Sequence, residues 1–407
     1  MKGNRLGKKL QVMAVLLVGL AILFLQDERN VLAGGPLVLK DNYPGLEIPM
    51  TEYGFRGMGE DGTGRLYLSA LLMNGVYLFP RGCLKQDCAN FVKLSPPLSD
   101  PGKIVGLPGG GAFVLLRLAD RIDYIPANCG SDECVRAILL PRRPSYPSGG
   151  VVNRSTGTVW VTEQLAGQIS RIPKGCFHAS CMTSIGLPSR GPGPSGISRD
   201  PGKGFWITER NADRIAFLPD GCRTTACIHE YSIPYQGSSL HPFSPVTLAN
   251  GMIAFLLKGG RVIGIGQLEN QGMIFHFISI GKEVGRVRTI LSGPNQNLIL
   301  VAAGAYPHVG HLTLTKTCLE KQDSAGTGCL DLRIIPIANG EPFGLYPGRK
   351  GHYWITLRNL DTVVRFRLTP KHCMNSGKTL LPACYRTVAF SRQETLYHKK
   401  YHQEVSH

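Results

Sequence analysis

The twelve cysteines of this 407-residue chain fall into close pairs that recur at a nearly regular interval. The first members of successive pairs are 46, 47, 46, 96 and 55 residues apart, and the step of 96 is close to two intervals. Such a period indicates tandem units rather than two or three unrelated domains. We predict seven units, the fifth of which (residues 243–282) lacks a pair and has Gln267-Leu268-Glu269-Asn270 at its hairpin. The pairs are Cys83/Cys88, Cys129/Cys134, Cys176/Cys181, Cys222/Cys227, Cys318/Cys329 and Cys373/Cys384.

Each pair is expected to form a local disulfide. A zinc site would need a pair to converge with a second pair or with histidines. Here each pair stands alone in the sequence, and the N-terminal segment described below indicates export to a compartment where disulfides persist.

The fourth unit, residues 193–234, shows the internal organisation of a repeat. Short apolar runs at 197–199, 205–208, 214–218 and 227–233 alternate with Gly, Pro, Asn and Asp clusters, which is the pattern of four short strands and their turns. Other units share this register. The fold class predicted is all-β: a seven-bladed β-propeller of four-stranded antiparallel blades with disulfide-closed outer hairpins, over residues 53–391. A linear β-solenoid, the competing architecture, would have shorter repeats.

The N-terminus reads as a targeting segment over residues 1–33. Lys2, Arg5 and Lys8 belong to a basic stretch that precedes the uncharged apolar run Leu10–Leu25. Val31-Leu32-Ala33 offers a signal-peptidase site, and the run is short for a membrane span. A cleaved signal peptide and a retained signal anchor both remain open, and either places the rest of the chain outside the cytoplasm, in the periplasm or the medium. Residues 34–52 form an N-terminal segment in which Leu46-Glu47-Ile48-Pro49 is a possible clasp strand for the last blade.

The net charge of +17 is spread along the chain and is densest in the His/Lys-rich tail, residues 392–407. It fits either a generally basic soluble surface or binding to an anionic polymer or membrane. We expect no nucleic-acid partner, because no nucleic-acid-binding motif is present. We expect a monomer that touches a membrane only through an uncleaved N-terminal segment, with an unidentified envelope ligand or protein as partner.

The fourth unit carries a family resemblance. Its segments Gly-Pro-Ser-Gly-Ile (193–197), Phe-Trp-Ile-Thr-Glu-Arg-Asn-Ala-Asp-Arg-Ile (205–215) and Glu-Tyr-Ser-Ile-Pro (230–234) resemble the repeat of the virginiamycin B lyase family. The third and seventh units repeat parts of the pattern. The resemblance implies a seven-bladed propeller and a magnesium-dependent lyase that opens a cyclic depsipeptide by elimination, with a histidine after the blade-opening proline and glutamates at the central mouth.

This chain departs from that pattern at the positions that matter for chemistry. The matching histidine positions hold Ser148, Ser195, Val246 and Phe343, so the imidazole base is missing there. The matching glutamate positions, after the second strand of each unit, are Ala70, Leu116, Glu163, Glu209, Leu256, Ala302 and Leu357, and Glu341 opens the last unit.

The remaining polar residues define candidate sites. Glu163, Glu209 and Glu341 could hold a hard cation, Mg or Ca, although a purely structural role for the carboxylates stays open. Three arginines follow the second strands and, with two blade-opening serines, could bind an acidic or polar ligand at the central mouth. These ligand candidates are Arg117, Arg210, Arg358, Ser148 and Ser195.

Histidines elsewhere were weighed as substitutes for the missing base. His241 lies just before the fifth unit and could act as a catalytic base in the mouth. His308 and His311 could form a metal pair or lie in an exposed loop. The three tryptophans share one repeat position and are expected in the blade core: Trp160, Trp206 and Trp354.

These features favour a binding function. We expect an exported propeller that binds a ligand or protein partner through its central mouth, without lyase activity and with no cofactor required. The alternative is a metal-dependent lyase or lactone hydrolase that uses the glutamates above and His241.

Overall fold

The computed structural model describes residues 38–40, 47–49, 54–83, 86–237, 239–269, 272–280, 285–293, 298–303, 308–315, 319, 330–334, 342–348, 353–357, 362–366 and 385–389. The chain divides into two units, residues 1–51 and 52–407. Within the described residues, no helix is long and apolar enough to cross a membrane.

In the first unit, β1 (Val38–Lys40) pairs antiparallel with β2 (Glu47–Pro49). A clasp formed by residues 46–49 on the last blade stays a prediction. The short separation of β1 and β2 allows them to pair with each other locally.

The second unit consists of four-stranded antiparallel sheets, each built from four consecutive strands. We call these sheets blades 1 to 7 in chain order. Blades 1 to 4 are β3 (Phe55–Glu60), β4 (Leu66–Ala70), β5 (Gly75–Phe79), β6 (Asn90–Lys93); β7 (Pro101–Gly106), β8 (Ala112–Leu116), β9 (Arg121–Ile125), β10 (Arg136–Leu139); β11 (Pro147–Val152), β12 (Val159–Glu163), β13 (Gln168–Ile172), β14 (Thr183–Gly186); and β15 (Pro194–Asp200), β16 (Gly204–Glu209), β17 (Arg214–Pro219), β18 (His229–Ser232).

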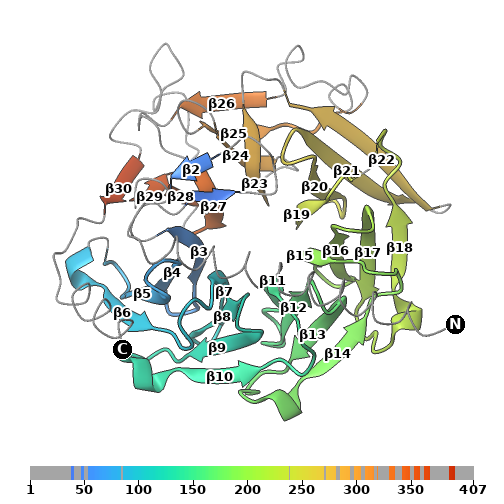
Figure 1. Ribbon diagram of the computed structural model, residues 1–407. Coiled ribbons are helices and arrows are strands. Elements are labelled where there is room, and N and C mark those ends of the chain that lie inside the picture. The colour runs from blue at the N-terminus through green and yellow to red at the C-terminus, as the bar shows by residue number, and fades with distance from the viewer. Residues whose placement is uncertain are drawn as a thin grey trace, which may run out of the picture. The chain divides into compact units, whose positions relative to one another are not determined.

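The remaining blades follow the same order. They are β19 (Phe243–Thr247), β20 (Ile253–Leu257), β21 (Val262–Glu269), β22 (Gly272–Ser279); β23 (Arg286–Ser292), β24 (Leu298–Ala303), β25 (His308–Leu312), β26 (Leu330–Ile334); and β27 (Pro342–Pro347), β28 (Tyr353–Leu357), β29 (Thr362–Phe366), β30 (Tyr385–Ala389). Figure 1 shows the first strand of each blade, from β3 to β27, facing the centre of the ring. The prediction of an all-β propeller with four-stranded antiparallel blades is confirmed.

The inner strands touch one another around the axis. Each contacts the inner strand of the next blade, and β27 contacts β3. Every inner strand also has a register shift near its start, for example between Pro147 and Gly149 and between Pro194 and Gly196. In the fifth blade, Leu257 pairs with Val262 as Glu163 pairs with Gln168 in the third. The hairpin pairing thus places Leu257 at the position of Glu163, one residue after the predicted Leu256, whereas the pairing of the inner strand places Leu256 opposite Phe243.

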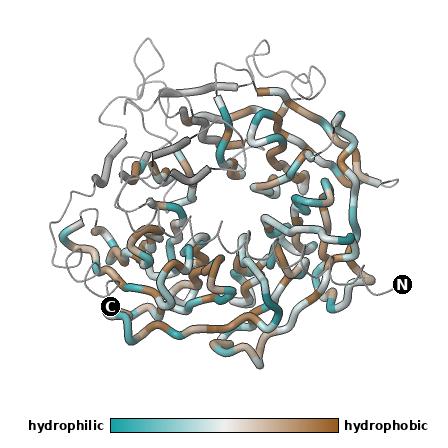
Figure 2. The backbone as a smooth tube through the Cα atoms, viewed as in Figure 1, coloured by the Kyte–Doolittle hydropathy of each residue, from teal (hydrophilic) through white to brown (hydrophobic). Residues whose placement is uncertain are grey.

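Apolar side chains fill the spaces between blades. Figure 2 shows apolar stretches along the middle strands of the blades. Trp160, Trp206 and Trp354 are 5%, 1% and 5% exposed, which confirms their assignment to the core. Burying both faces of each middle strand explains why β4, β8, β12, β16 and β20 are buried throughout.

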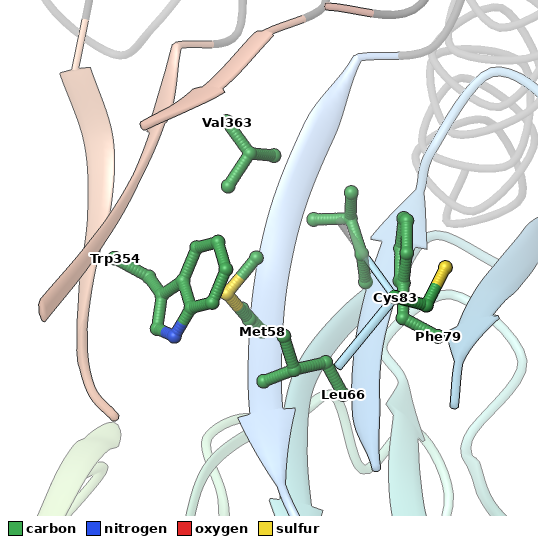
Figure 3. Close-up of a pocket in the computed structure, with 7 residues that line it drawn as sticks. Met58, Leu66, Phe79, Cys83, Trp354 and Val363 are labelled. Atoms are coloured by element: carbon green, nitrogen blue, oxygen red, sulfur yellow. The ribbon is translucent and has the colours of Figure 1, made fainter. Parts of the chain in front are cut away.

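Blades 7 and 1 close against each other through packed side chains and a hydrogen bond from the Tyr346 hydroxyl to the carbonyl oxygen of Arg56. Trp354 and Val363 of blade 7 join Phe55 and Met58 of blade 1 in one core cluster. Figure 3 shows Trp354 and Val363 on one side of a small apolar space and Leu66, Phe79 and Cys83 on the other. This space is about 10 Å³, so the closure is nearly as tightly packed as the rest of the core.

The outer hairpins of blades 1 to 4 are closed by the four predicted disulfides with short spacing: Cys83–Cys88, Cys129–Cys134, Cys176–Cys181 and Cys222–Cys227. Each hairpin contains one 3-10 turn: η1 (Gln86–Cys88), η2 (Asp132–Cys134), η3 (Ala179–Cys181) or η4 (Thr225–Cys227). These turns tie blades together, since Thr225 donates its hydroxyl to the carbonyl of Gly186 on the preceding blade. The cysteines Cys318, Cys329, Cys373 and Cys384 lie outside the described residues.

We predict that glycine is required where neighbouring inner strands approach each other closely around the axis. A Cβ atom on Gly57 would lie 1.8 Å from the carbonyl oxygen of Gly102 on the next inner strand. Gly57→Ala should therefore lower the free energy of unfolding by about 1–3 kcal/mol. Gly109→Ala, where a Cβ would meet nothing within 4 Å, is the control and should change it by less than about 0.5 kcal/mol. Equal unfolding midpoints in urea for the two variants would contradict this packing.

We also predict that the outer disulfides stabilise the ring. Replacing both Cys222 and Cys227 by alanine should lower the free energy of unfolding by about 2 kcal/mol, because the short loop is no longer restrained in the unfolded chain. Chemical denaturation under non-reducing conditions measures this change. An unchanged midpoint would show that the hairpin is held by its hydrogen bonds alone.

Candidate functional site

The candidate residues gather on the edge of the ring where inner strands begin and second strands end. In blade 3, Pro147 at the start of β11 pairs with Glu163 at the end of β12. The hairpin after each second strand and the loop before each inner strand therefore meet on this edge. A repeated hydrogen bond joins them: Asp120 accepts from the backbone of Ser145 and Tyr146, and Asp213 accepts from the backbone of His241.

A cluster of charged and aromatic side chains lies at the start of the inner strands of blades 1 to 4. We call Arg56, Asp100, Arg117, Tyr146 and Arg210 the mouth cluster. Arg117 pairs with Asp100 at 2.6 Å, Arg56 lies 3.6 Å from the same carboxylate, and Arg117 stacks over the ring of Tyr146. Burial and the charge of Asp100 raise the pKa of Tyr146, and the charges of Arg56 and Arg210 oppose this rise.

The mouth cluster has an excess of positive charge. Arg56 and Arg117 face one carboxylate, and their Nε atoms are buried without a hydrogen-bond acceptor. Burial raises the pKa of Asp100, and the charge of Arg56 opposes the shift. A buried guanidinium N–H that lacks an acceptor is unfavourable, so an anionic oxygen at this place would be favourable.

Three members of the mouth cluster, Arg56, Asp100 and Tyr146, were not identified from the sequence. Two of them precede the blade-opening proline, as His241 does. Asp100, Tyr146 and His241 all have positive φ, of 54°, 55° and 48°. The residue before the blade-opening proline is therefore the repeat position from which Asp100 and Tyr146 could have been predicted.

His241 is held by the neighbouring blade. Its Nδ1 lies 3.1 Å from the carbonyl oxygen of Arg210, and because a carbonyl only accepts, Nδ1 carries the proton. Nε2 is then the basic nitrogen of the neutral ring. The ring is partly buried, at the repeat position that Asp100 and Tyr146 occupy in blades 2 and 3. A catalytic role for His241 stays a prediction.

Ser148 and Ser195 have hydroxyls occupied by the protein itself. Ser148 Oγ lies 3.2 Å from the carbonyl oxygens of Pro194 and Ser195 on the next inner strand, and Ser195 Oγ lies 3.0 Å from that of Pro242. These bonds give both serines a structural role. Ligand binding by them stays a prediction.

Glu163 is fully buried and accepts hydrogen bonds from Ser145, Gln168 and Ser170. Burial raises its pKa, and these three hydrogen bonds oppose the rise. Its carboxylate oxygens thus already accept hydrogen bonds from β13 of its own blade and from the loop before β11. This arrangement holds the hairpin in place and leaves little capacity for a metal ion.

Glu209 has different surroundings. It is fully buried, neither carboxylate oxygen has a hydrogen-bond partner of ordinary geometry, and Ser189 only partly opposes the rise in its pKa. Burial and the neighbouring Glu230 raise its pKa to about 8. Burial also raises the pKa of Glu230, but hydrogen bonds from Ser189 outweigh this and lower the pKa overall. Near neutral pH, protonated Glu209 therefore faces ionised Glu230, which Arg214 also pairs with at 3.0 Å.

The described residues do not fit the magnesium or calcium site expected from the sequence. Glu163 is already hydrogen-bonded, Glu209 favours its protonated form, and among the described residues no three Asp, Glu, His or Cys side chains group to hold a metal. The remaining candidates Glu341 and Arg358 lie outside the described residues. His308 and His311 belong to β25.

A hollow of about 330 Å³ lies on the same edge between blades 3 and 4. Gln164 and Leu165 from the hairpin of blade 3, and Ser189 and Pro192 from the loop before β15, contribute to its lining together with Arg142. It is separate from the mouth cluster, whose residues do not line it.

We predict a pH-dependent stability that depends on Glu209. Its folded-state pKa of about 8 exceeds the ordinary value of 4.5, so folding is favoured by the protonated form. The stabilisation that protonated Glu209 gives to the folded state is fully present below pH 4.5 and is lost as the pH rises through 8. Unfolding free energies measured between pH 5 and 9 should therefore fall by roughly 2–4 kcal/mol in the wild type.

Glu209→Gln should flatten this profile, because the amide keeps a donor toward Glu230 at every pH. Glu133→Gln, at an exposed position, is the control and should leave the profile unchanged. A wild-type profile that is already flat would contradict the buried acid pair.

With the geometry of the fold and site established, the chain can be compared with known proteins. No family model and no curated protein matches it. Among solved structures it is similar to virginiamycin B lyase from Staphylococcus aureus, with a TM-score of 0.60 and 20% identity over 76% of this chain and 93% of that one. A streptogramin B lyase gives a TM-score of 0.59 and 18% identity over 77% and 93%.

A more distant similarity is to YCF48 bound to D1 peptide, with a TM-score of 0.54 and 10% identity over 80% of this chain and 96% of that one. Identities at this level are informative about architecture. The chain has the β-propeller fold of the virginiamycin B lyases.

Proposed function

We propose that this protein is an exported seven-bladed propeller that binds an anionic ligand, or an anionic group of a protein partner, through its mouth cluster. The observation that carries the proposal is the excess of arginine over carboxylate there, with two buried guanidinium N–H groups lacking acceptors. The basic N-terminal stretch with its apolar run supports export, and the disulfides of blades 1 to 4 are compatible with an oxidising compartment.

Binding without catalysis is the function that the site supports best. The positions where the resembling family places histidine hold Ser148 and Ser195, and both hydroxyls bond to neighbouring strands. The glutamates that would hold a metal are hydrogen-bonded or protonated. Propellers with this architecture also bind peptides, as YCF48 does with D1 peptide. His241 stays the candidate base of the alternative function, a metal-dependent lyase or lactone hydrolase.

A direct test uses calorimetric titration with citrate, succinate and inorganic phosphate, with erythritol as a neutral control. The multivalent anions should bind, more weakly as salt rises, because the attraction is electrostatic. Arg117→Gln and Arg210→Gln should each weaken binding by about tenfold, because each substitution removes one charge-assisted hydrogen bond to the anion.

Arg142→Gln is the matched control, since Arg142 lies on the same edge but outside the mouth cluster. No binding of any anion, or an equal loss in the Arg142 variant, would overturn the proposal. In a separate arm, quinupristin is incubated with the protein and Mg²⁺. We expect it to stay intact, and its opening would favour the lyase function instead.

A further inference from the structure

The outer hairpin of blade 5 differs from those of blades 1 to 4. Its strands β21 and β22 have eight residues each, whereas β6, β10, β14 and β18 have four. Strand β20 pairs with β21 only as far as Gly266. Residues 267–269 therefore pair only with residues 272–274, and this end of the hairpin is a two-stranded ribbon that extends beyond the blade (Figure 1).

The missing cysteine pair explains the longer strands. In blades 1 to 4 a disulfide loop and a 3-10 turn separate the third strand from the fourth, so the ladder between them stops after four residue pairs. Blade 5 has no cysteines, and its ladder continues through eight pairs, from Val262 with Ser279 to Glu269 with Gly272. The absent disulfide is thus replaced by a longer strand at the rim of the ring.

Among the strands that the structure describes, β22 is the edge of its sheet, and its sequence carries none of the usual protecting features of an edge. Natural edge strands are kept from pairing with other chains by short length, charged side chains or proline. The outer strands β6, β10 and β18 each carry a charged residue, Lys93, Arg136 and Glu230, and β14 has only four residues. In contrast β22, Gly-Met-Ile-Phe-His-Phe-Ile-Ser, is long and has no Asp, Glu, Lys, Arg or Pro.

The strand is also held in one conformation. Phe275 and Phe277 stack with ring centroids 6.2 Å apart, and Tyr235 packs edge-on against Phe277 at 4.8 Å. These contacts fix the face of β22 that points to blade 4. Ile274 is 45% exposed, and Leu268 on the paired strand is 49% exposed. A strand that is already ordered loses little entropy when another strand pairs with it.

We propose that β22 is a dimerisation edge, which pairs antiparallel with β22 of a second copy of this chain. Antiparallel pairing of identical strands is two-fold symmetric, so each copy's edge is covered by the other's and the assembly closes as a dimer. Because β22 has no Asp, Glu, Lys or Arg, the pairing places no two of these side chains of like charge opposite each other. The same pairing through β10 would bring Arg136 of both copies together.

Charge also argues for a second copy over an acidic or basic segment of another protein. Such a segment gains affinity from opposite charge, and β22 offers none. The inference is independent of ligand binding at the mouth cluster, and it replaces the expectation of a monomer drawn from the sequence.

The test is sedimentation velocity of the full mature chain over about 1–200 µM, since dimer population rises with concentration. The wild type should shift from monomer toward dimer across this range. Ile274→Lys places a charge on the exposed side of the edge and should raise the dimer dissociation constant at least about tenfold. Leu139→Lys is the matched control: Leu139 is 50% exposed on the outer strand of a disulfide-closed blade and should leave dimerisation unchanged.

Amide hydrogen exchange supplies a second measurement that does not depend on a variant folding well. Amides of residues 272–279 should exchange more slowly at high protein concentration, while those of β10 should not change. A wild type that stays monomeric, a dimer that survives Ile274→Lys in folded protein, or an equal loss in Leu139→Lys would each overturn the proposal.

Discussion

The close approach of the inner strands around the axis is the constraint on which the rest of the ring depends. A Cβ on Gly149 would lie 2.9 Å from the Cα of Gly196, and one on Gly196 would lie 2.3 Å from Pro245. Such spacing needs a bulge at the start of each inner strand, and a hydroxyl of the second strand stabilises it: Thr162 accepts from the backbone N–H of Gly149. Ser69 and Thr356 do the same for Gly57 and Gly344 in blades 1 and 7. The G-x-G-like openings of the repeat are therefore requirements of packing.

The same geometry determines which residues can reach the mouth. In blades 1, 2 and 4 the turn after the second strand ends on a residue with positive φ, Asn74 at 48°, Asp120 at 51° and Asp213 at 53°, whose side chain accepts a hydrogen bond from the loop of the next blade. Asp100 and Tyr146 belong to two of these loops, directly before the inner strands of blades 2 and 3. The mouth cluster is thus built from positions that already have a role in joining blades, and its charge can vary without loss of the fold.

The sequence was sufficient for the blade architecture because its signals are local and repeated. Cysteine spacing, turn residues and buried second strands each recur, and the four described disulfides and the tryptophan positions agree with them. The site was harder to predict, because its contacts join residues from different blades. Nothing in the sequence near Glu209 indicates that Glu230 will face it. Arg56 is recognisable as a site residue only in the folded structure, where Asp100 of the next blade lies beside it.

The serines at the start of blades 3 and 4 connect fold and function most directly. At the position where the resembling family places an imidazole, Ser148 and Ser195 bond to backbone carbonyls of the next inner strand. A neutral serine hydroxyl is too weak a base to remove a proton from a substrate unaided. These side chains therefore stabilise the joint between blades, whereas Arg56 and Arg117 have buried Nε atoms without acceptors. Under the proposed function, the same ring architecture would carry anion binding at its centre in place of the lyase chemistry that the resembling family implies.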